Sequence, residues 1–266
     1  TELDTRAGAF FFDSATNTLF IRLANDAPPA GHLVEVALQR RVLFFYPNAP
    51  GHLCIEGLTF RHNNASAAHR QMAGVTLLGN TLLSNSIVEQ MDLAGVATSG
   101  TVSRCLIRDN GQLGLSLNST ATLEHSVVAR NNRRHFNPYW EAGGMKVVTN
   151  QAARIEGCHV FDNDGVGIWL DGSSGSATAS VTVARNWVHG NGREGQIMVE
   201  LSNFATVVNN VVWNDGRVAD ENVRGLYVSE SSDVLVAFNT VVSTAPTFEF
   251  DALSGSRGTI ERLQLE

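Results

Sequence analysis

The sequence has little cysteine, little charge and no long apolar run. Three of its 266 residues are cysteine, 17% are charged and 43% are apolar. No window approaches the roughly 20 apolar residues that a transmembrane helix needs, so we expect a folded chain with no membrane partner. Three cysteines are too few for a disulfide framework, and we find no secretory signal before the first strand-like residues.

Positive charge is also scarce. The chain carries 19 Lys and Arg against 26 Asp and Glu, a formal net charge of -7, and its basic residues are scattered. Proteins that bind nucleic acid need a clustered basic surface, so we predict no nucleic-acid partner. The acidic balance also disfavours a polyanionic substrate unless a local basic cleft overrides it.

Two phrases recur along the chain. The first is an apolar pair and a polar run that closes on Asn, Asp or Gly; it reads LIRDNG at Leu106, VVARNN at Val127, HVFDND at His159, WVHGNG at Trp187 and VVWNDG at Val211. The second begins with Gly or Gln and alternates; it reads GVTLL at Gly74, GVATS at Gly95, GLSLN at Gly114, GMKVV at Gly144, GIWLD at Gly167, QIMVE at Gln196 and GLYVS at Gly225. Cys54, Cys105 and Cys158, which are 51 and 53 residues apart, follow the same repeat.

Short strands broken by Asn, Asp and Gly every 19 to 30 residues are typical of stacked solenoid coils. A leucine-rich repeat would need a regular leucine framework, and a sandwich of hairpins would need two-residue reversing turns. Here the polar corner lies between the first and the second recurring phrase, as expected where the chain bends and continues into the next coil. We therefore predict an all-β fold, a right-handed parallel β-helix.

The first part of the chain does not follow the repeat. FFFDSATNTLFIRL indicates two strands around a turn, so we assign residues 1–52 to a β-rich lead-in that caps the helix and covers its edge. Residues 53–266 then form the β-helix. The final GTIERLQLE predicts one more strand without a cap, and we expect the natural chain to extend beyond it.

The corner residues favour structural roles. Asn tolerates left-handed backbone and can bond neighbouring turns, which suits Asn110, Asn131, Asn163 and Asn191. Five residues before each corner, a small side chain recurs and is expected to stack inside the helix: Cys105, Ser126, Cys158, Asn186 and Asn210. His159 and His189 lie in the same phrases without zinc-ligand spacing, so we interpret them as structural and predict no bound metal.

Alternation along the second phrase assigns its side chains to two faces of a strand. Two almost wholly apolar columns, such as Ile168 and Leu170 in GIWLD, must face the core. The columns between them point outward, and Asp171 and Glu200 occupy the same outward column on consecutive coils. Neighbouring parallel strands lie about 4.8 Å apart, so we expect the two carboxyl groups at about that separation.

A carboxyl pair at this distance suits glycoside hydrolysis. Retaining glycosidases hold a nucleophile and an acid/base about 5–5.5 Å apart, whereas inverting enzymes need about 6.5–9.5 Å. Two close carboxylates cannot both ionise easily, so one pKa rises and that group can donate a proton. The structural alternative is a polar surface column in which two acids stack by chance or bind a structural cation.

Several further residues are candidates for substrate binding. Trp169 in the other outward column can pack against a sugar ring, and Lys146 can bond hydroxyls or bias the ionisation of Asp171. Tyr227 continues that column. The long insertion RRHFNPYWEAG gathers aromatic and charged side chains on a loop, where binding groups collect; its candidates are His135, Tyr139, Trp140 and Glu141.

Three segments resemble a known family. EAGGMKVV (Glu141–Val148), DNDGVGIWLD (Asp162–Asp171) and the Glu200 that closes QIMVE are similar to the β-helix glycoside hydrolases of the β-xylosidase type. The resemblance implies that Asp171 is the nucleophile, Glu200 the general acid/base and Glu141 a residue that holds substrate hydroxyls. The sequence departs from that family where Trp140 replaces an expected His, in the GSSGSA insertion after Asp171, and in its shorter length.

We therefore predict a retaining glycoside hydrolase that acts on an oligosaccharide or polysaccharide without a cofactor. A Ca²⁺-dependent polysaccharide lyase or uronate epimerase, in which Asp171 and Glu200 hold the ion and Lys146 abstracts a proton, is the alternative within enzymes. A non-catalytic carbohydrate-binding β-helix is the third possibility. Such glycans are met outside the cytoplasm or as imported oligosaccharides, which favours an extracellular or periplasmic site and leaves a cytoplasmic one open.

Overall fold

A computed structural model describes residues 5–47, 51–65, 72–148, 151–192, 194–214, 223–243, 248–251 and 264–265. The chain divides into two compact units, Thr1–Ala37 and Leu38–Glu266. The described residues contain no helix that is long and apolar enough to cross a membrane.

The smaller unit is a two-stranded hairpin. β1 (Phe10–Asp13) pairs antiparallel with β2 (Thr18–Ile21), as the phrase FFFDSATNTLFIRL predicts. Asp13 closes the turn, because its carboxylate accepts bonds from the Ala15 amide and the Thr16 hydroxyl. These two bonds lower the pKa of Asp13. That this unit caps the helix stays a prediction.

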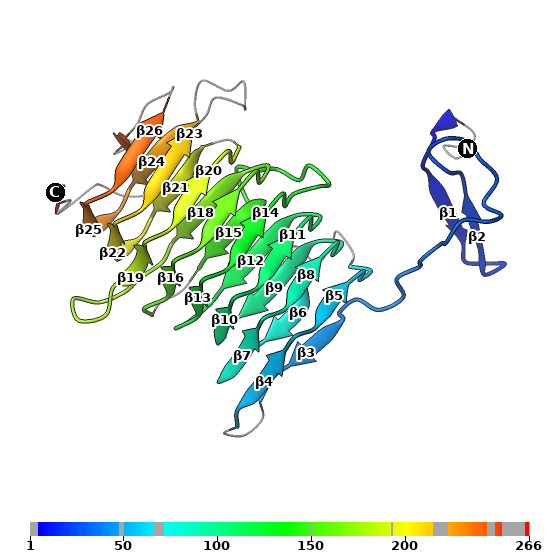
Figure 1. Cartoon of the computed structure of the whole chain (residues 1–266), viewed down its shortest axis with the longest axis horizontal. Coiled ribbons are helices and arrows are strands. Elements are labelled where there is room, and N and C mark those ends of the chain that lie inside the picture. Colours follow the sequence, from blue (N-terminus) through cyan, green and yellow to red (C-terminus); the bar gives the residue numbers. More distant parts are fainter. Residues whose placement is uncertain are drawn as a thin grey trace. The chain divides into compact units, whose positions relative to one another are not determined.

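The larger unit consists of three parallel sheets, each built from one strand per coil (Figure 1). Sheet 1 contains β3 (Leu43–Phe45), β6 (Ala73–Leu77), β9 (Ala94–Thr98), β12 (Leu113–Leu117), β15 (Gly143–Val147), β18 (Val166–Asp171), β21 (Gly195–Glu200), β24 (Arg224–Ser229) and β27 (Phe248–Asp251). Sheet 2 contains β4 (Leu53–Glu56), β7 (Thr81–Ser84), β10 (Thr101–Ser103), β13 (Thr122–Glu124), β16 (Arg154–Glu156), β19 (Val181–Ala184), β22 (Asn203–Val208), β25 (Ser232–Ala237) and β28 (Gln264–Leu265). Sheet 3 contains β5 (Thr59–Arg61), β8 (Ile87–Glu89), β11 (Leu106–Arg108), β14 (Val127–Ala129), β17 (His159–Phe161), β20 (Trp187–His189), β23 (Val211–Asn214) and β26 (Thr240–Ser243).

Successive strands of the chain belong to different sheets, and every third strand pairs in register with its equivalent on the next coil. This is the parallel β-helix that the repeat predicts. The expected boundary at residue 52 differs from the observed arrangement, since β3 lies before it and already pairs with β6 through Leu43 and Val75.

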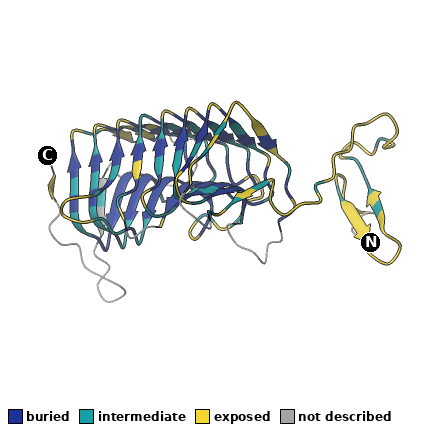
Figure 2. Cartoon of the chain, turned by 90° about the horizontal axis from the view of Figure 1, so that it is seen from below, coloured by how far each residue is buried: buried dark blue, intermediate teal, exposed yellow. Residues whose placement is uncertain are grey.

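The core lies between the three sheets, as the burial colours show (Figure 2). The two columns of sheet 1 that alternation assigns to the interior are buried throughout: Val75, Val96, Leu115, Met145, Ile168, Ile197 and Leu226 form one, and Leu77, Thr98, Leu117, Val147, Leu170, Val199 and Val228 form the other. Their predicted inward orientation is confirmed. The middle residues of the short sheet 3 strands, such as Val160 and Val188, complete the core.

The Asn corners form a buried ladder. The Asn131 side-chain amide donates to Asn163 Oδ1 at 2.8 Å, and the Asn163 amide donates to Asn191 Oδ1 at 2.8 Å. The amide of Asn110 donates to Asn131 Oδ1 in the same way. The predicted small stack is also inside, since Cys105, Ser126, Cys158, Asn186 and Asn210 are all at most 3% exposed. The structural interpretation of both sets is confirmed.

One detail of the corners differs from expectation. The left-handed backbone lies at the residue before each ladder Asn, at Asp109 (φ 54°), Arg130 (φ 52°), Asp162 (φ 53°) and Gly190 (φ 62°). The corner Asn itself keeps ordinary backbone, because its side chain must point inward to reach the next rung. A single left-handed residue bends the chain into the next sheet, and the Asn after it supplies the hydrogen bonds.

We expect Asn163→Ala to lower the free energy of unfolding by about 3 kcal/mol, because the buried Asn131 amide loses its acceptor. The midpoint of urea unfolding measures the effect. Asn64→Ala, at an exposed position, is the matched control and should change stability by less than about 0.5 kcal/mol. Equal stability of both variants would contradict the ladder's role.

The three cysteines differ in accessibility. Burial raises the pKa of the Cys158 thiol to about 12 and also raises the pKa of Cys105, whereas Cys54 is exposed. Thiolate is the reactive form. At pH 8 the native protein should therefore react with an aromatic disulfide reagent at Cys54 alone, and all three thiols should react in guanidinium. Rapid titration of three thiols in the native protein would contradict this prediction.

Candidate functional site

The predicted carboxyl pair lies at the ends of two adjacent strands of sheet 1. β18 ends at Asp171 and β21 at Glu200, and the two residues are register partners. Both side chains are half-buried, so each is held by the scaffold and still reaches solvent. The predicted outward register of this pair is confirmed. The strand spacing of about 4.8 Å brings the two carboxylates into one site.

Lys146 lies beneath this pair. It precedes the C-terminal residue of β15, and its Nζ is 2.6 Å from Asp171 Oδ2. Its side chain is only 8% exposed, and the ammonium also donates to the backbone carbonyl of Trp140. Lys146 thus fixes the position of the Asp171 carboxylate at the end of β18.

Trp169 differs from expectation. It points away from the core, as predicted, but it is only 5% exposed and its ring face is not open to a sugar. The Lys146 ammonium lies 4.1 Å from the ring centroid, a cation–π contact, and Met198 is its register partner on the next coil. The indole Nε1 donates to Glu200 Oε2 at 3.2 Å. Trp169 therefore orients Glu200 and Lys146.

Trp169 is buried because it belongs to an outward column in which long side chains cover one another. Trp169, Met198 and Tyr227, from consecutive strands, form an apolar cluster with Val166 on the outer face of sheet 1. Tyr227 is 6% exposed, so it too lacks an open ring face. Side chains stacked about 4.8 Å apart bury each other's faces even on the outside of a sheet.

An ion-pair network that the sequence reasoning missed adjoins Tyr227. The Arg224 guanidinium lies 4.4 Å from the Tyr227 ring centroid and pairs with Glu194 at 3.0 Å and Glu249 at 2.6 Å. The hydrogen bonds to Glu249 raise the pKa of Arg224, and their effect is larger than the opposing effect of burial. The sequence signal was an Arg directly before GLYVS, where the other copies of the phrase carry no cation.

The candidate residues of the insertion before β15 differ in their exposure and in their distance from the carboxyl pair. Trp140 is 56% exposed, and its ring centroid is 5.8 Å from Lys146 Nζ, so this aromatic side chain lies beside the pair. Tyr139 is 48% exposed, and Glu141 is only 8% exposed. His135 instead bonds Asp164 through Nδ1 at 2.8 Å, at the corner before β18.

The histidines of the corner phrases belong to another face. His159 stacks on Trp187 with centroids 4.2 Å apart, and its Nε2 lies 2.8 Å from His189 Nε2, on the outside of sheet 3. Burial and, to a smaller extent, the charge of His189 lower the pKa of His159. Among the described residues no three His, Cys, Asp or Glu side chains form a cluster suited to a metal ion.

Residues 48–241 match the family described as the right handed beta helix region. The chain belongs to this right-handed β-helix family. The match confirms the predicted fold and its handedness, and it includes β15, β18 and β21, which carry Lys146, Asp171 and Glu200. No curated protein matches the sequence closely enough to establish a nearer relative.

Two solved structures share this β-helix. The crystal structure of pectate lyase Pel9A aligns with a TM-score of 0.53 at 14% identity, over 88% of this chain and 66% of that one. The complex structure of XylC with xylose aligns with a TM-score of 0.57 at 12% identity, over 91% of this chain and 46% of that one. This β-helix thus spans less than two thirds of either protein. Identities this low show the shared fold alone.

We expect Lys146→Met to lower the free energy of unfolding by about 1–3 kcal/mol at neutral pH, because it leaves Asp171 without its cation. The cost stays below that of a fully buried pair, since the Asp171 side chain is 26% exposed and can be hydrated. Thermal and urea unfolding measure it. Lys146→Arg keeps the charge and should lose less stability; equal losses in both variants would contradict the ion pair's role.

Proposed function

We propose that the protein hydrolyses a glycosidic bond with retention of configuration, with Asp171 as nucleophile and Glu200 as general acid/base. The observation that carries the proposal is the register pairing of the two carboxylates at the ends of β18 and β21. Strand spacing alone brings their backbones to about 4.8 Å, which suits the roughly 5–5.5 Å carboxyl separation of retaining enzymes. An inverting enzyme would need room for a water between them.

Contacts with neighbouring strands hold both carboxylates in place. Asp171 contacts the Lys146 ammonium at 2.6 Å, which fixes the position of the carboxylate proposed as the nucleophile. Glu200 accepts a hydrogen bond from the Trp169 indole at 3.2 Å, which orients the carboxyl group proposed as the acid/base.

The chemistry then takes two steps. Asp171 attacks the anomeric carbon while Glu200 transfers its proton to the departing glycosidic oxygen, which leaves a sugar covalently bound to Asp171. In the second step Glu200, now a carboxylate, takes a proton from water as the water oxygen attacks the anomeric carbon. The bond to Asp171 breaks, and both carboxyl groups return to their starting states.

Substrate contacts would come from the insertion beside the pair. Trp140 and Tyr139 are exposed and can pack against sugar rings. Glu141 directly follows the residue whose carbonyl binds Lys146, and its carboxylate has no hydrogen-bond or ion-pair partner among the described residues. A sugar hydroxyl would supply a donor to it. Trp169 and Tyr227 would support the site rather than bind sugar, because their rings are covered.

Elimination by a lyase is the second reaction that this fold could perform. The neighbours do not distinguish the two, because one is a pectate lyase and the other contains xylose. A lyase mechanism would use Lys146 as the base. Its ammonium contacts Asp171 and the Trp140 carbonyl and is nearly buried, which disfavours proton abstraction from a bound uronate.

The test is turnover of aryl glycosides by the wild type, Asp171→Gly and Glu200→Gln. Asp171→Gly should lose at least about 10³-fold in kcat, and added azide should restore release of the aryl group with inverted configuration. Glu200→Gln should lose about 10²–10⁴-fold on substrates with poor leaving groups and less on good ones. Proton NMR of the first-formed sugar anomer reports retention in the wild type.

Asp109→Asn is the matched control. Asp109 is also part-buried and ion-paired, with Arg130 at 2.9 Å, but lies at a sheet 3 corner, so this variant should keep wild-type turnover. Undiminished activity of Asp171→Gly would overturn the mechanism. Unsaturated, ultraviolet-absorbing products that disappear with a chelator would identify a lyase instead, and glycan binding without turnover would identify a binding protein.

A further inference from the structure

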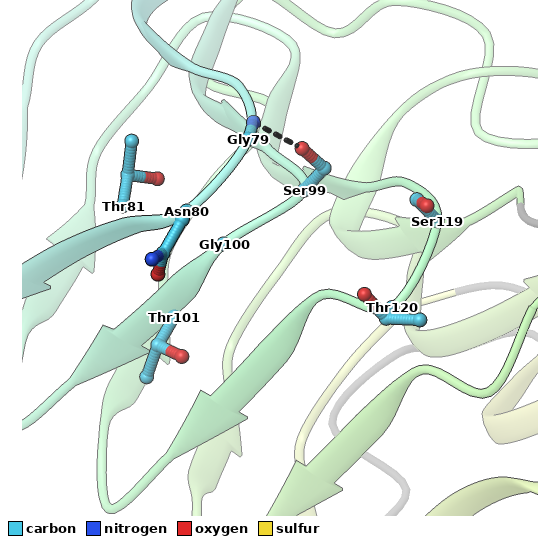
Figure 3. A pocket seen from close by; sticks show the side chains of 8 residues that line it. All are labelled: Gly79, Asn80, Thr81, Ser99, Gly100, Thr101, Ser119 and Thr120. Atoms are coloured by element: carbon cyan, nitrogen blue, oxygen red, sulfur yellow. Dashed lines mark hydrogen bonds between the residues drawn. The ribbon is translucent and has the colours of Figure 1, made fainter. Parts of the chain in front are cut away.

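A hollow lies on the larger unit at the turns between sheets 1 and 2. It has a volume of about 370 Å³ and is formed by three consecutive turns, from β6 to β7, from β9 to β10 and from β12 to β13 (Figure 3). Besides two glycines, six polar residues line it: Asn80, Thr81, Ser99, Thr101, Ser119 and Thr120. The sequence signal is a short Gly-, Ser-, Thr- and Asn-rich turn, repeated as GNT, SGT and NST.

The hollow is lined by neutral hydrogen-bonding groups. No lining residue carries a charge, and five of the six side chains present hydroxyls while Asn80 presents an amide. Thr81 is 3% exposed, and its Oγ1 has no hydrogen-bond partner within the described residues. A neutral polyhydroxylated ligand matches such a lining, whereas the lining residues offer no charge to an anion.

Gly100 allows the second turn of the hollow to pack closely against the first. A Cβ at this position would lie 2.2 Å from Thr81 Oγ1 and 2.4 Å from the Thr81 carbonyl oxygen, so no other residue fits without moving the backbone. Ser99 accepts a bond from the Gly79 amide at 2.7 Å, which ties the first two turns together (Figure 3). The hollow is thus held by the same coil-to-coil contacts as the fold.

The hollow continues the column that carries the carboxyl pair. Thr98, Leu117, Val147 and Leu170 are successive register partners, so the residues that follow them, Ser99, Asn118, Val148 and Asp171, occupy successive rungs of one outward column. The backbone bonds from Asn118 to Thr98 and from Val148 to Leu117 extend this register past the strand ends. Ser99 therefore lies three rungs, or about 14 Å, from Asp171.

The side chains that lie between the carboxyl pair and the hollow in this column are accessible to solvent. Asn118 is half-buried and Val148 is 46% exposed. A chain of several linked sugars that follows the helix axis can therefore reach from the carboxyl pair to the hollow. A single sugar or a disaccharide at the pair cannot.

We propose that the hollow is a distal binding subsite for a neutral sugar unit, so that the substrate is an uncharged linear oligosaccharide or polysaccharide extended along the β-helix axis. This inference rests on the proposed function for the identity of the cleavage site. Binding energy gained in the hollow is available only to chains long enough to span both sites.

The test measures binding as a function of chain length. A panel of neutral linear oligosaccharides, from di- to octasaccharides and including a xylo-oligosaccharide series, is titrated by calorimetry against Asp171→Asn, which cannot turn them over. Oligogalacturonates of equal length are the charged counterparts. We expect at least one neutral series to gain about tenfold or more in affinity once its chain spans the two sites, and no comparable gain for the charged series.

Thr120→Trp, combined with Asp171→Asn, fills the hollow from an exposed position and should abolish that gain without changing the affinity for disaccharides. Thr59→Trp, at an exposed position on sheet 3, is the matched control and should retain the gain. Asn80→Ala removes one amide without added bulk and should weaken long-chain binding by about threefold. Asn80→Ala provides the test if Thr120→Trp fails to fold.

Aryl monosaccharide glycosides separate this inference from the proposed function, because they occupy the carboxyl pair alone. Thr120→Trp in the otherwise wild-type chain should hydrolyse them at the wild-type rate. If the wild type does not hydrolyse them, the proposed function fails, while a length-dependent gain lost in Thr120→Trp still supports the hollow. A gain that survives Thr120→Trp, a gain confined to the charged series, or the absence of any gain overturns the inference.

Discussion

In-register stacking of parallel strands is the constraint on which the larger unit depends. Each coil places a residue about 4.8 Å from its equivalent on the coils before and after it, so side chains form columns along the axis. In the interior this produces the apolar columns and the Asn ladder from Asn110 to Gln196. On the outside it produces the pair Asp171 and Glu200.

The same constraint explains why the outer face of sheet 1 resembles an interior. Lys146, Trp169, Met198 and Tyr227 follow one another along the axis, and each covers part of the next. Their burial removes two aromatic rings from the solvent and places a nearly buried cation against Asp171. The aromatic column is therefore better understood as the support of the carboxyl pair than as a surface on which sugars stack.

A β-helix is a scaffold on which different reactions occur, so the residues of the site decide which reaction the protein can perform. The fold is shared with a pectate lyase and with a structure that contains xylose, at 14% and 12% identity. What favours hydrolysis here is the register pairing of Asp171 with Glu200 and the contacts that already occupy the Lys146 ammonium. A neutral hollow in the same column adds a reason to expect an uncharged, extended substrate.

The periodicity of the sequence was sufficient to predict the β-helix, its inward columns and the register of Asp171 with Glu200, because strand alternation and coil spacing are local rules. It did not predict which residue of each corner takes left-handed backbone, since both Asn110 and Asp109 tolerate it. Nor did it predict the burial of Trp169, the cation over Tyr227 or the hollow around Gly100. Those features depend on how side chains from different coils pack together, and only the tertiary structure brings these coils into contact.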